Sequence, residues 1–177
     1  YPTVACGVIV WAALARRIDK HRAWMVGMTM MSIVTVSYML VGQGDIVAIV
    51  AILALSGIGS GALTALPASM KADVVDLDAL ESGEDRAGLF FAAWSLAVKF
   101  IAAFGQGLAF TTLAWIGFEA KGSNGPDEIL GLRLFYSGGP MVLYAIAMLL
   151  VWRYPITAKR HGELRRELAE RGVREAG

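Results

Sequence analysis

Residues 87–118 read AGLFFAAWSLAVKFIAAFGQGLAFTTLAWIGF, and Lys99 is the only charged residue in this run. The run exceeds the roughly 20 residues that an α-helix needs to cross a hydrocarbon core about 30 Å thick. An ammonium group in such a segment costs about 3 kcal/mol on insertion scales, so it is usually retained for binding or pairing. Lys99 is therefore the first candidate for a functional residue.

Apolar residues make up 56% of the 177 residues and are gathered into runs of membrane-spanning length. Lipid offers no partner to unpaired backbone groups, so we expect each run to be helical. The sequence predicts an all-α polytopic membrane protein with a bundle over residues 1–155 and a polar cytoplasmic tail over 156–177. We expect the chain to be a fragment that begins inside its first, shortened helix. The predicted spans are residues 1–15, 23–41, 46–70, 87–118 and 134–152.

The basic residues of the connecting segments alternate strongly along the chain. Thirteen lie in the segment after the first run, the segment after the third run and the tail, and two lie in the remaining segments. The positive-inside rule places the thirteen in the cytoplasm. We therefore predict a multi-pass protein of the inner membrane with a cytoplasmic C-terminus. The net charge of +1 gives no reason to expect a nucleic-acid partner.

The predicted cytoplasmic loop 71–86 is acidic, and its residues are candidates for a gate. Asp73 and Asp76 are spaced i, i+3, so one helical turn would set both on one face. They could then pair with basic residues of the other cytoplasmic loop, and such pairs would lock one conformation and release another. The alternative is a solvated surface. The candidate partners are Arg16, Arg17 and Arg22, and Arg86 closes the loop.

Glycines recur at every second position in the third run. Gly57, Gly59 and Gly61 allow helices to approach closely. Together with Pro67 they also allow bending or local unwinding. Close packing and a helix that moves during a transport cycle both remain open.

The helix predicted around Lys99 has one polar stripe. At 100° per residue, Lys99 and Gln106 lie at about 40° and about 20° from Ser95, with small residues beside them. Such a stripe suits a polar cavity between helices, where Lys99 would bind a ligand or belong to an ion pathway. Two alternatives stay open: a structural ion pair with a carboxylate outside this chain, and a side chain extended toward the headgroups.

Residues 65–100, ALPASMKADVVDLDALESGEDRAGLFFAAWSLAVKF, resemble the glycoside–pentoside–hexuronide:cation symporters of the major facilitator superfamily. The tail segment YPITAKRHGELRREL (154–168) resembles the family's segment after helix twelve. The resemblance implies helices eight to twelve of the C-terminal bundle. It also implies that the partner N-terminal bundle, which carries most cation-binding acids, lies outside this chain.

In that family a helix-eleven lysine faces the central cavity, and Lys99 would match it. Asp73 and Asp76 would match residues near the cytoplasmic gate. The loop LARRIDKHRAW (14–24) departs from the superfamily motif, because Arg16 stands where an Asp is expected and Asp19 stands near an expected Gly.

We therefore expect a symporter that couples a sugar or glycoside to Na⁺ or H⁺ by alternating access, with no other cofactor, no metal site and no catalytic residue. Lys99, Ser95 and Gln106 would line the cavity. A lipid or lysolipid carrier of the same fold and a non-transporting membrane scaffold are the alternatives. An enzyme is a weaker interpretation, because no predicted span carries a nucleophile with its base.

Overall fold

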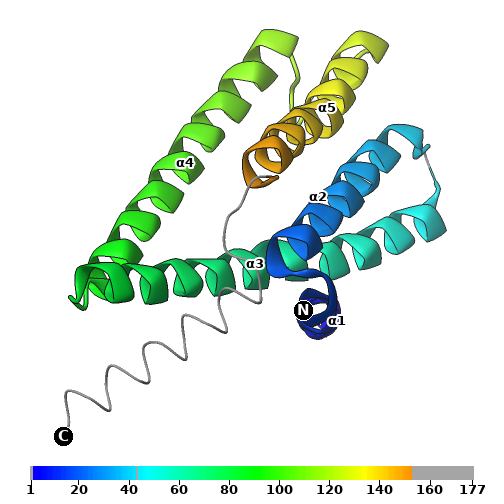
Figure 1. Ribbon diagram of the computed structural model, residues 1–177. Coiled ribbons are helices and arrows are strands. Elements are labelled where there is room, and N and C mark those ends of the chain that lie inside the picture. Colours follow the sequence, from blue (N-terminus) through cyan, green and yellow to red (C-terminus); the bar gives the residue numbers. More distant parts are fainter. Residues whose placement is uncertain (1, 43, 153–177) are drawn as a thin grey trace, which may run out of the picture.

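The structure, a computed structural model, describes residues 2–42 and 44–152 and is all-helical there, as the sequence predicts (Figure 1). The tail predicted at 156–177 lies outside the described residues. A short 3₁₀ turn, Tyr38–Leu40, follows the second helix. The five α-helices are α1 (Pro2–Ile18), α2 (Lys20–Ser37), α3 (Ile46–Ser82), α4 (Ala87–Ile116) and α5 (Pro126–Val151).

The core lies where α1 and α2 pack against α3. Its centre consists of Trp11 and Ala15 on α1, Ala23 on α2, and Ala62 and Leu66 on α3. Mostly small side chains let the three backbones approach closely, which is how helices associate in lipid. A short turn joins α2 and α3 into a tight hairpin, with Gly44 in the left-handed conformation (φ 89°).

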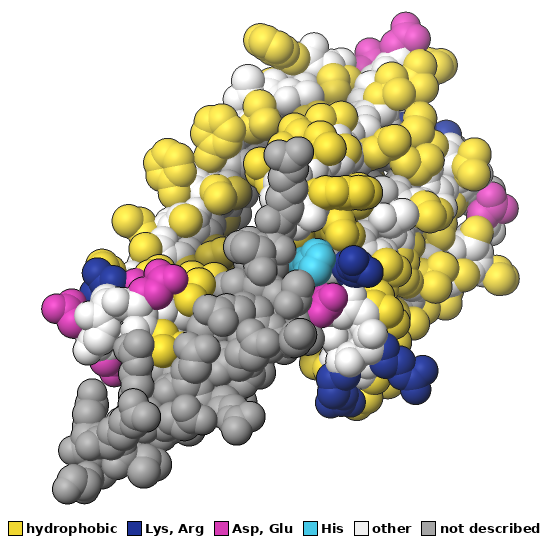
Figure 2. All heavy atoms as spheres, in the orientation of Figure 1, with side chains coloured by type: hydrophobic (Ala, Val, Ile, Leu, Met, Phe, Trp, Pro, Cys, Tyr) yellow, Lys and Arg dark blue, Asp and Glu magenta, His cyan; other side chains and the backbone are white. Residues whose placement is uncertain are grey.

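Helix α5 packs along α2, and the rings of Tyr38 and Tyr136 meet edge to face with centroids 5.4 Å apart. Helix α4 packs on α5 and meets α3 only near its own N-terminal part, and none of its residues is buried (Figure 1). On the face of the molecule that Figure 2 shows, hydrophobic side chains cover much of the surface and charged groups lie toward the helix ends. A bilayer does not penalise such an apolar surface, because lipid tails are as apolar as the side chains.

Four helices of the described part are long and apolar enough to cross a membrane, and α1 is shorter, at 17 residues. Two helices extend beyond the predicted spans. Helix α3 does not end near residue 70 but continues to Ser82, which gives 37 residues and a length of about 55 Å. Helix α5 begins at Pro126, ahead of the predicted span 134–152, because Pro suits the first helical turn and two acidic residues follow it.

Candidate functional site

The most buried charged residue of the described part is Asp73, on the C-terminal extension of α3 that the sequence predicts to be a loop. Its carboxylate accepts two hydrogen bonds from Lys20 Nζ, at 2.6 and 2.7 Å. Asp73 is 2% exposed as a whole residue and 4% exposed in its side chain, whereas the Lys20 side chain keeps 26% of its surface open to solvent. The pair joins the first residue of α2 to α3 across 53 residues of sequence.

Lys20, which pairs with Asp73, comes from the same predicted loop as the candidate partners Arg16, Arg17 and Arg22. Arg16 and Arg17 occupy the last turn of α1 and are exposed. Lys20 follows a sharp change of direction at Asp19, whose φ of 73° and ψ of 150° lie where glycine is normally required. The backbone conformation of Asp19 sets the direction in which α2 begins. Lys20, the first residue of α2, therefore points toward α3 and pairs with Asp73.

A cavity of ≈ 500 Å³ lies beside this ion pair, between α1 and α3. Arg16, Lys20 and Ser69 supply its polar lining, and alanines with Leu66 supply the rest. The two cations and one hydroxyl share an end of the bundle with Asp76, which is half-buried one helical turn after Asp73. The predicted gate residues of α1 and α3 thus gather at one end of the fold.

Arg86 lies apart from that group and closes the α3–α4 connection. Its Nε donates to Asp78 Oδ2 at 3.0 Å, and Nη2 donates to the other oxygen. The hydrogen bond and the negative charge of Asp78 raise the pKa of Arg86 above its usual value. Gly83, at φ 72°, ends α3 and turns the chain so that the pair can form.

Lys99, Ser95 and Gln106 lie on α4, and all three are exposed. Among residues 2–42 and 44–152 no carboxylate forms an ion pair with Lys99. The other helices of the described part do not enclose this stripe. That these residues line a substrate or cation cavity stays a prediction.

The glycines of α3 are packing positions. A Cβ on Gly61 would overlap the backbone of Gly7 and Val8, and one on Gly57 would overlap Thr3. A Cβ on Gly59 would likewise overlap the Met31 sulfur on α2. Trp11 adds a tether between the helices, since its indole donates to the Ile58 carbonyl at 2.9 Å. Helix α3 runs without interruption through these glycines and Pro67, so their role in flexibility stays a prediction.

Three features of this end of the molecule are not predicted from the sequence: the pairing of Lys20 with Asp73, the placement of Lys71 beside aromatic rings of α4, and the buried indole nitrogen of Trp24. The helical spacing of Val74, Leu77 and Leu80 within the acidic stretch was the available signal that α3 continues. No local pattern identifies contacts between residues so distant in sequence.

Comparison with known proteins matches the chain over residues 3–158 to the family model described as MFS/sugar transport protein. An uncharacterized symporter of Synechocystis is 29% identical over 170 residues, which is 93% of this chain and 31% of that protein. The sodium-dependent lysophosphatidylcholine symporter 1 of Gallus gallus is 26% identical over 163 residues, covering 90% and 31%. The glucuronide carrier protein homolog of Escherichia coli is 25% identical over 169 residues, covering 96% and 37%.

The chain thus spans about a third of the length of these relatives. The resemblance read from residues 65–100 is confirmed by relatives that carry the names symporter and glucuronide carrier homolog. Four apolar helices of spanning length fit the same family. Because the family model covers most of its residues, the chain belongs to the MFS/sugar transport protein family, a family of multi-pass membrane transporters.

Proposed function

We propose that the protein is a cation-coupled symporter of a sugar or glycoside, in which this chain supplies one helix bundle. The observation that carries the proposal is the match to the family model over residues 3–158. Substrate and coupling ion, Na⁺ or H⁺, bind near the midplane between two bundles, and rocking exposes them to either side in turn. No bond of the substrate is made or broken.

In this mechanism Lys99 faces the substrate path from α4, with Ser95 and Gln106 on the same stripe. An ammonium in an apolar helix is expensive, so a hydroxyl-rich or anionic group that binds it recovers part of that cost. The acidic residues that hold the coupling ion belong to a second helix bundle outside this chain. The protein sits in the inner membrane with Asp73, Asp76, Arg16, Arg17 and Arg86 on the cytoplasmic side.

The Lys20–Asp73 pair has a narrower role than a gate that opens and closes between bundles. Both of its residues belong to helices packed in one core, so rigid rocking of that core leaves the pair intact. It fixes the α1–α2 connection on α3 and so presents Arg16 and Arg17 at a constant position. The contacts that change during the cycle are those that the exposed arginines and Asp76 make with the other bundle.

The test is uptake into vesicles from cells that express the full-length protein, driven by an imposed Na⁺ or H⁺ gradient. Lys99→Ala should lower uptake of radiolabelled glycosides about tenfold or more, the factor expected for losing a hydrogen bond to a charged group. Lys121→Ala, in the α4–α5 connection, is the matched control and should transport normally. Normal uptake by Lys99→Ala would contradict the role given to this lysine.

A lysolipid carrier is the second candidate, favoured by the similarity to a chicken protein named as a lysophosphatidylcholine symporter. Labelled glycoside and labelled lysophosphatidylcholine are therefore offered to the same vesicles. Gradient-driven uptake of lysolipid alone would replace the sugar with an amphiphile. If no gradient drives either solute and Lys99→Ala lowers only the amount of protein in the membrane, a scaffold is the better account.

A further inference from the structure

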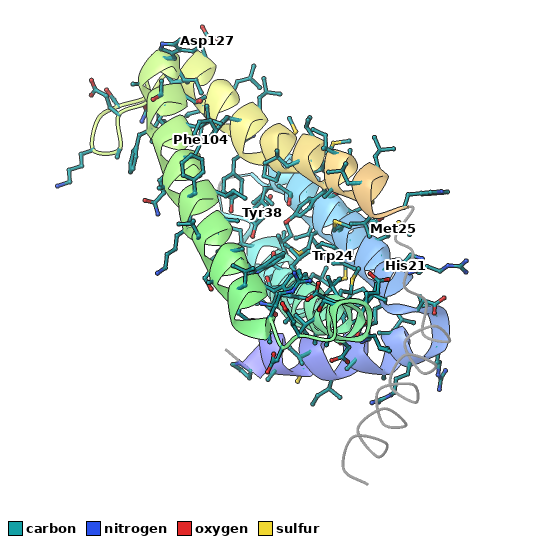
Figure 3. The ribbon with its side chains drawn as sticks, turned by 60° about the vertical axis from the view of Figure 1, so that its left-hand side comes forward. His21, Trp24, Met25, Tyr38, Phe104 and Asp127 are labelled. Carbon is teal, nitrogen blue, oxygen red and sulfur yellow. The ribbon has the colours of Figure 1, made fainter. Side chains whose placement is uncertain are left out.

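An apolar cavity of ≈ 520 Å³ lies between α3 and α4, near the end of the bundle that carries the ion pair. Its volume is within the range of small-molecule sites. All four long helices contribute to its wall, and Figure 3 shows Trp24 in the middle of this arrangement. Prominent in its lining are Trp24 of α2, Pro67 and Val74 of α3, Phe90 and Trp94 of α4, and Leu150 of α5.

One cation lines this cavity. Lys71 Nζ lies 4.4 Å from the ring centroid of Phe91 and 5.1 Å from that of Trp94. Within the part of the chain that the structure describes, no carboxylate forms an ion pair with Lys71. The aromatic faces hold the ammonium on an apolar wall but leave its charge uncompensated.

The second polar group is the indole N–H of Trp24. Its nitrogen is buried and has no hydrogen-bond acceptor among residues 2–42 and 44–152. A buried donor without an acceptor is rare, because it loses its hydration and gains nothing in return. Trp24 contributes its ring to the wall of the hollow, and Lys71 offers it an ammonium donor; the rest of the lining is hydrocarbon and aromatic rings.

We propose that this cavity binds one acyl chain of an anionic phospholipid, with the lipid phosphate at Lys71. The depth fits such a ligand, because Lys71 stands where the apolar part of α3 gives way to its acidic extension, two residues before Asp73. The chain lies along Phe90, Trp94 and Ala97 and covers the ring of Trp24. A free phosphate ion would meet the lysine but leave the apolar walls uncovered.

This lipid is a resident ligand and not the transported solute, so the proposal stands apart from the sugar symport proposed above. It predicts that α3 and α4, which share few contacts of their own, are bridged by the acyl chain. The leaflet involved is the one at the charged ends of α2 and α3, which the distribution of basic residues predicts to be cytoplasmic.

The first test measures lipid retention by native mass spectrometry on the full-length protein, delipidated and then given phosphatidylglycerol or phosphatidylcholine of the same chain length. We expect phosphatidylglycerol to be retained in preference. Lys71→Gln should lower its occupancy about fivefold, the factor of one basic residue at an anionic surface. Lys121→Gln removes a lysine from the opposite end and should leave occupancy unchanged. Inorganic phosphate should not compete.

The second test keeps the proposal decidable if Lys71→Gln does not fold. Phosphatidylglycerol with a photoreactive group in its acyl chain should label wild-type peptides that contain Trp94 and Leu150. Ala97→Phe, which fills the cavity and keeps Lys71, should remove that labelling. Equal lipid occupancy in wild type and Lys71→Gln, competition by inorganic phosphate, or labelling confined to other helices would overturn the proposal.

Discussion

Replacing Lys20 should lower the free energy of unfolding far more than replacing its ion-pair partner Asp73. Lys20→Met leaves a carboxylate that is 4% exposed without its ammonium, whereas Asp73→Asn leaves a lysine that is 26% exposed and can turn into water. Breaking a buried pair typically costs about 3–5 kcal/mol, and we expect Lys20→Met to fall in that range. Asp73→Asn keeps the shape of the side chain and should cost about 1 kcal/mol.

The double variant Lys20→Met/Asp73→Asn removes both charges and should be within about 1 kcal/mol of wild type, because no uncompensated charge remains buried. The coupling energy between the two positions is then about 3–5 kcal/mol, at or above the upper end of the range measured for contacting residues. A pair on an exposed surface would give about 0–1 kcal/mol.

The measurement is the free energy of unfolding of the full-length protein in detergent, for wild type, both single variants and the double variant. Arg86→Met is a matched control, since it removes a cation from the exposed pair with Asp78 and should leave stability unchanged. Equal costs for the two single substitutions, or a double variant whose cost equals their sum, would refute the reasoning. Either result would mean that Lys20 is not what compensates the charge of Asp73.

Three further predictions concern the packing and backbone of the α1–α3 region. Gly61→Ala should lower the melting temperature, at a cost of about 1–3 kcal/mol, because its Cβ would overlap the backbone of Gly7 and Val8. Gly105→Ala on α4, where a Cβ meets open space, should be neutral or stabilising by up to about 1 kcal/mol, and the opposite order of melting temperatures would contradict the packing. Asp19→Gly should be more stable than Asp19→Asn by about 1 kcal/mol, because both lose the charge and only glycine accommodates φ 73° without strain. Trp11→Phe should cost about 1 kcal/mol through loss of the hydrogen bond to the Ile58 carbonyl, and a melting temperature equal to that of wild type would show that this bond contributes nothing.

The helical class and the number of long helices could be read from the sequence because lipid restricts the choice of structure. A run such as 87–118 has few alternatives to a helix once it is placed in hydrocarbon. The limits of the helices were harder to predict, because charge ends a membrane span and does not end a helix. Helix α3 therefore passes from Met70 to Ser82 through acidic residues and stops at Gly83, where the backbone turns left-handed.

Of the candidate site, one residue could be predicted from the sequence and its partner could not. Asp73 could be identified as a candidate, because an acidic residue at the end of an apolar run is attracted electrostatically to a neighbouring basic loop. Its partner could not, because four basic residues lie within seven positions, at 16, 17, 20 and 22. Which of these residues pairs with Asp73 depends on the direction in which α2 begins. That direction is set by the positive φ of Asp19, which its residue type does not predict.

Lys71 and Lys99 show why a charge in an apolar context needs its surroundings before it can be assigned a role. By sequence, Lys99 is the anomaly and Lys71 is an ordinary loop residue. In the fold, Lys71 faces two aromatic rings at the wall of a cavity, while Lys99 lies on the open surface of α4. An exposed lysine at mid-helix is unfavourable in lipid, so the face of α4 that carries Lys99 requires water or another polar surface against it. The face that carries Phe90 and Trp94 requires only hydrocarbon. We therefore propose different neighbours on the two sides of α4: a polar path for a solute at Lys99, and a lipid phosphate at Lys71 of α3.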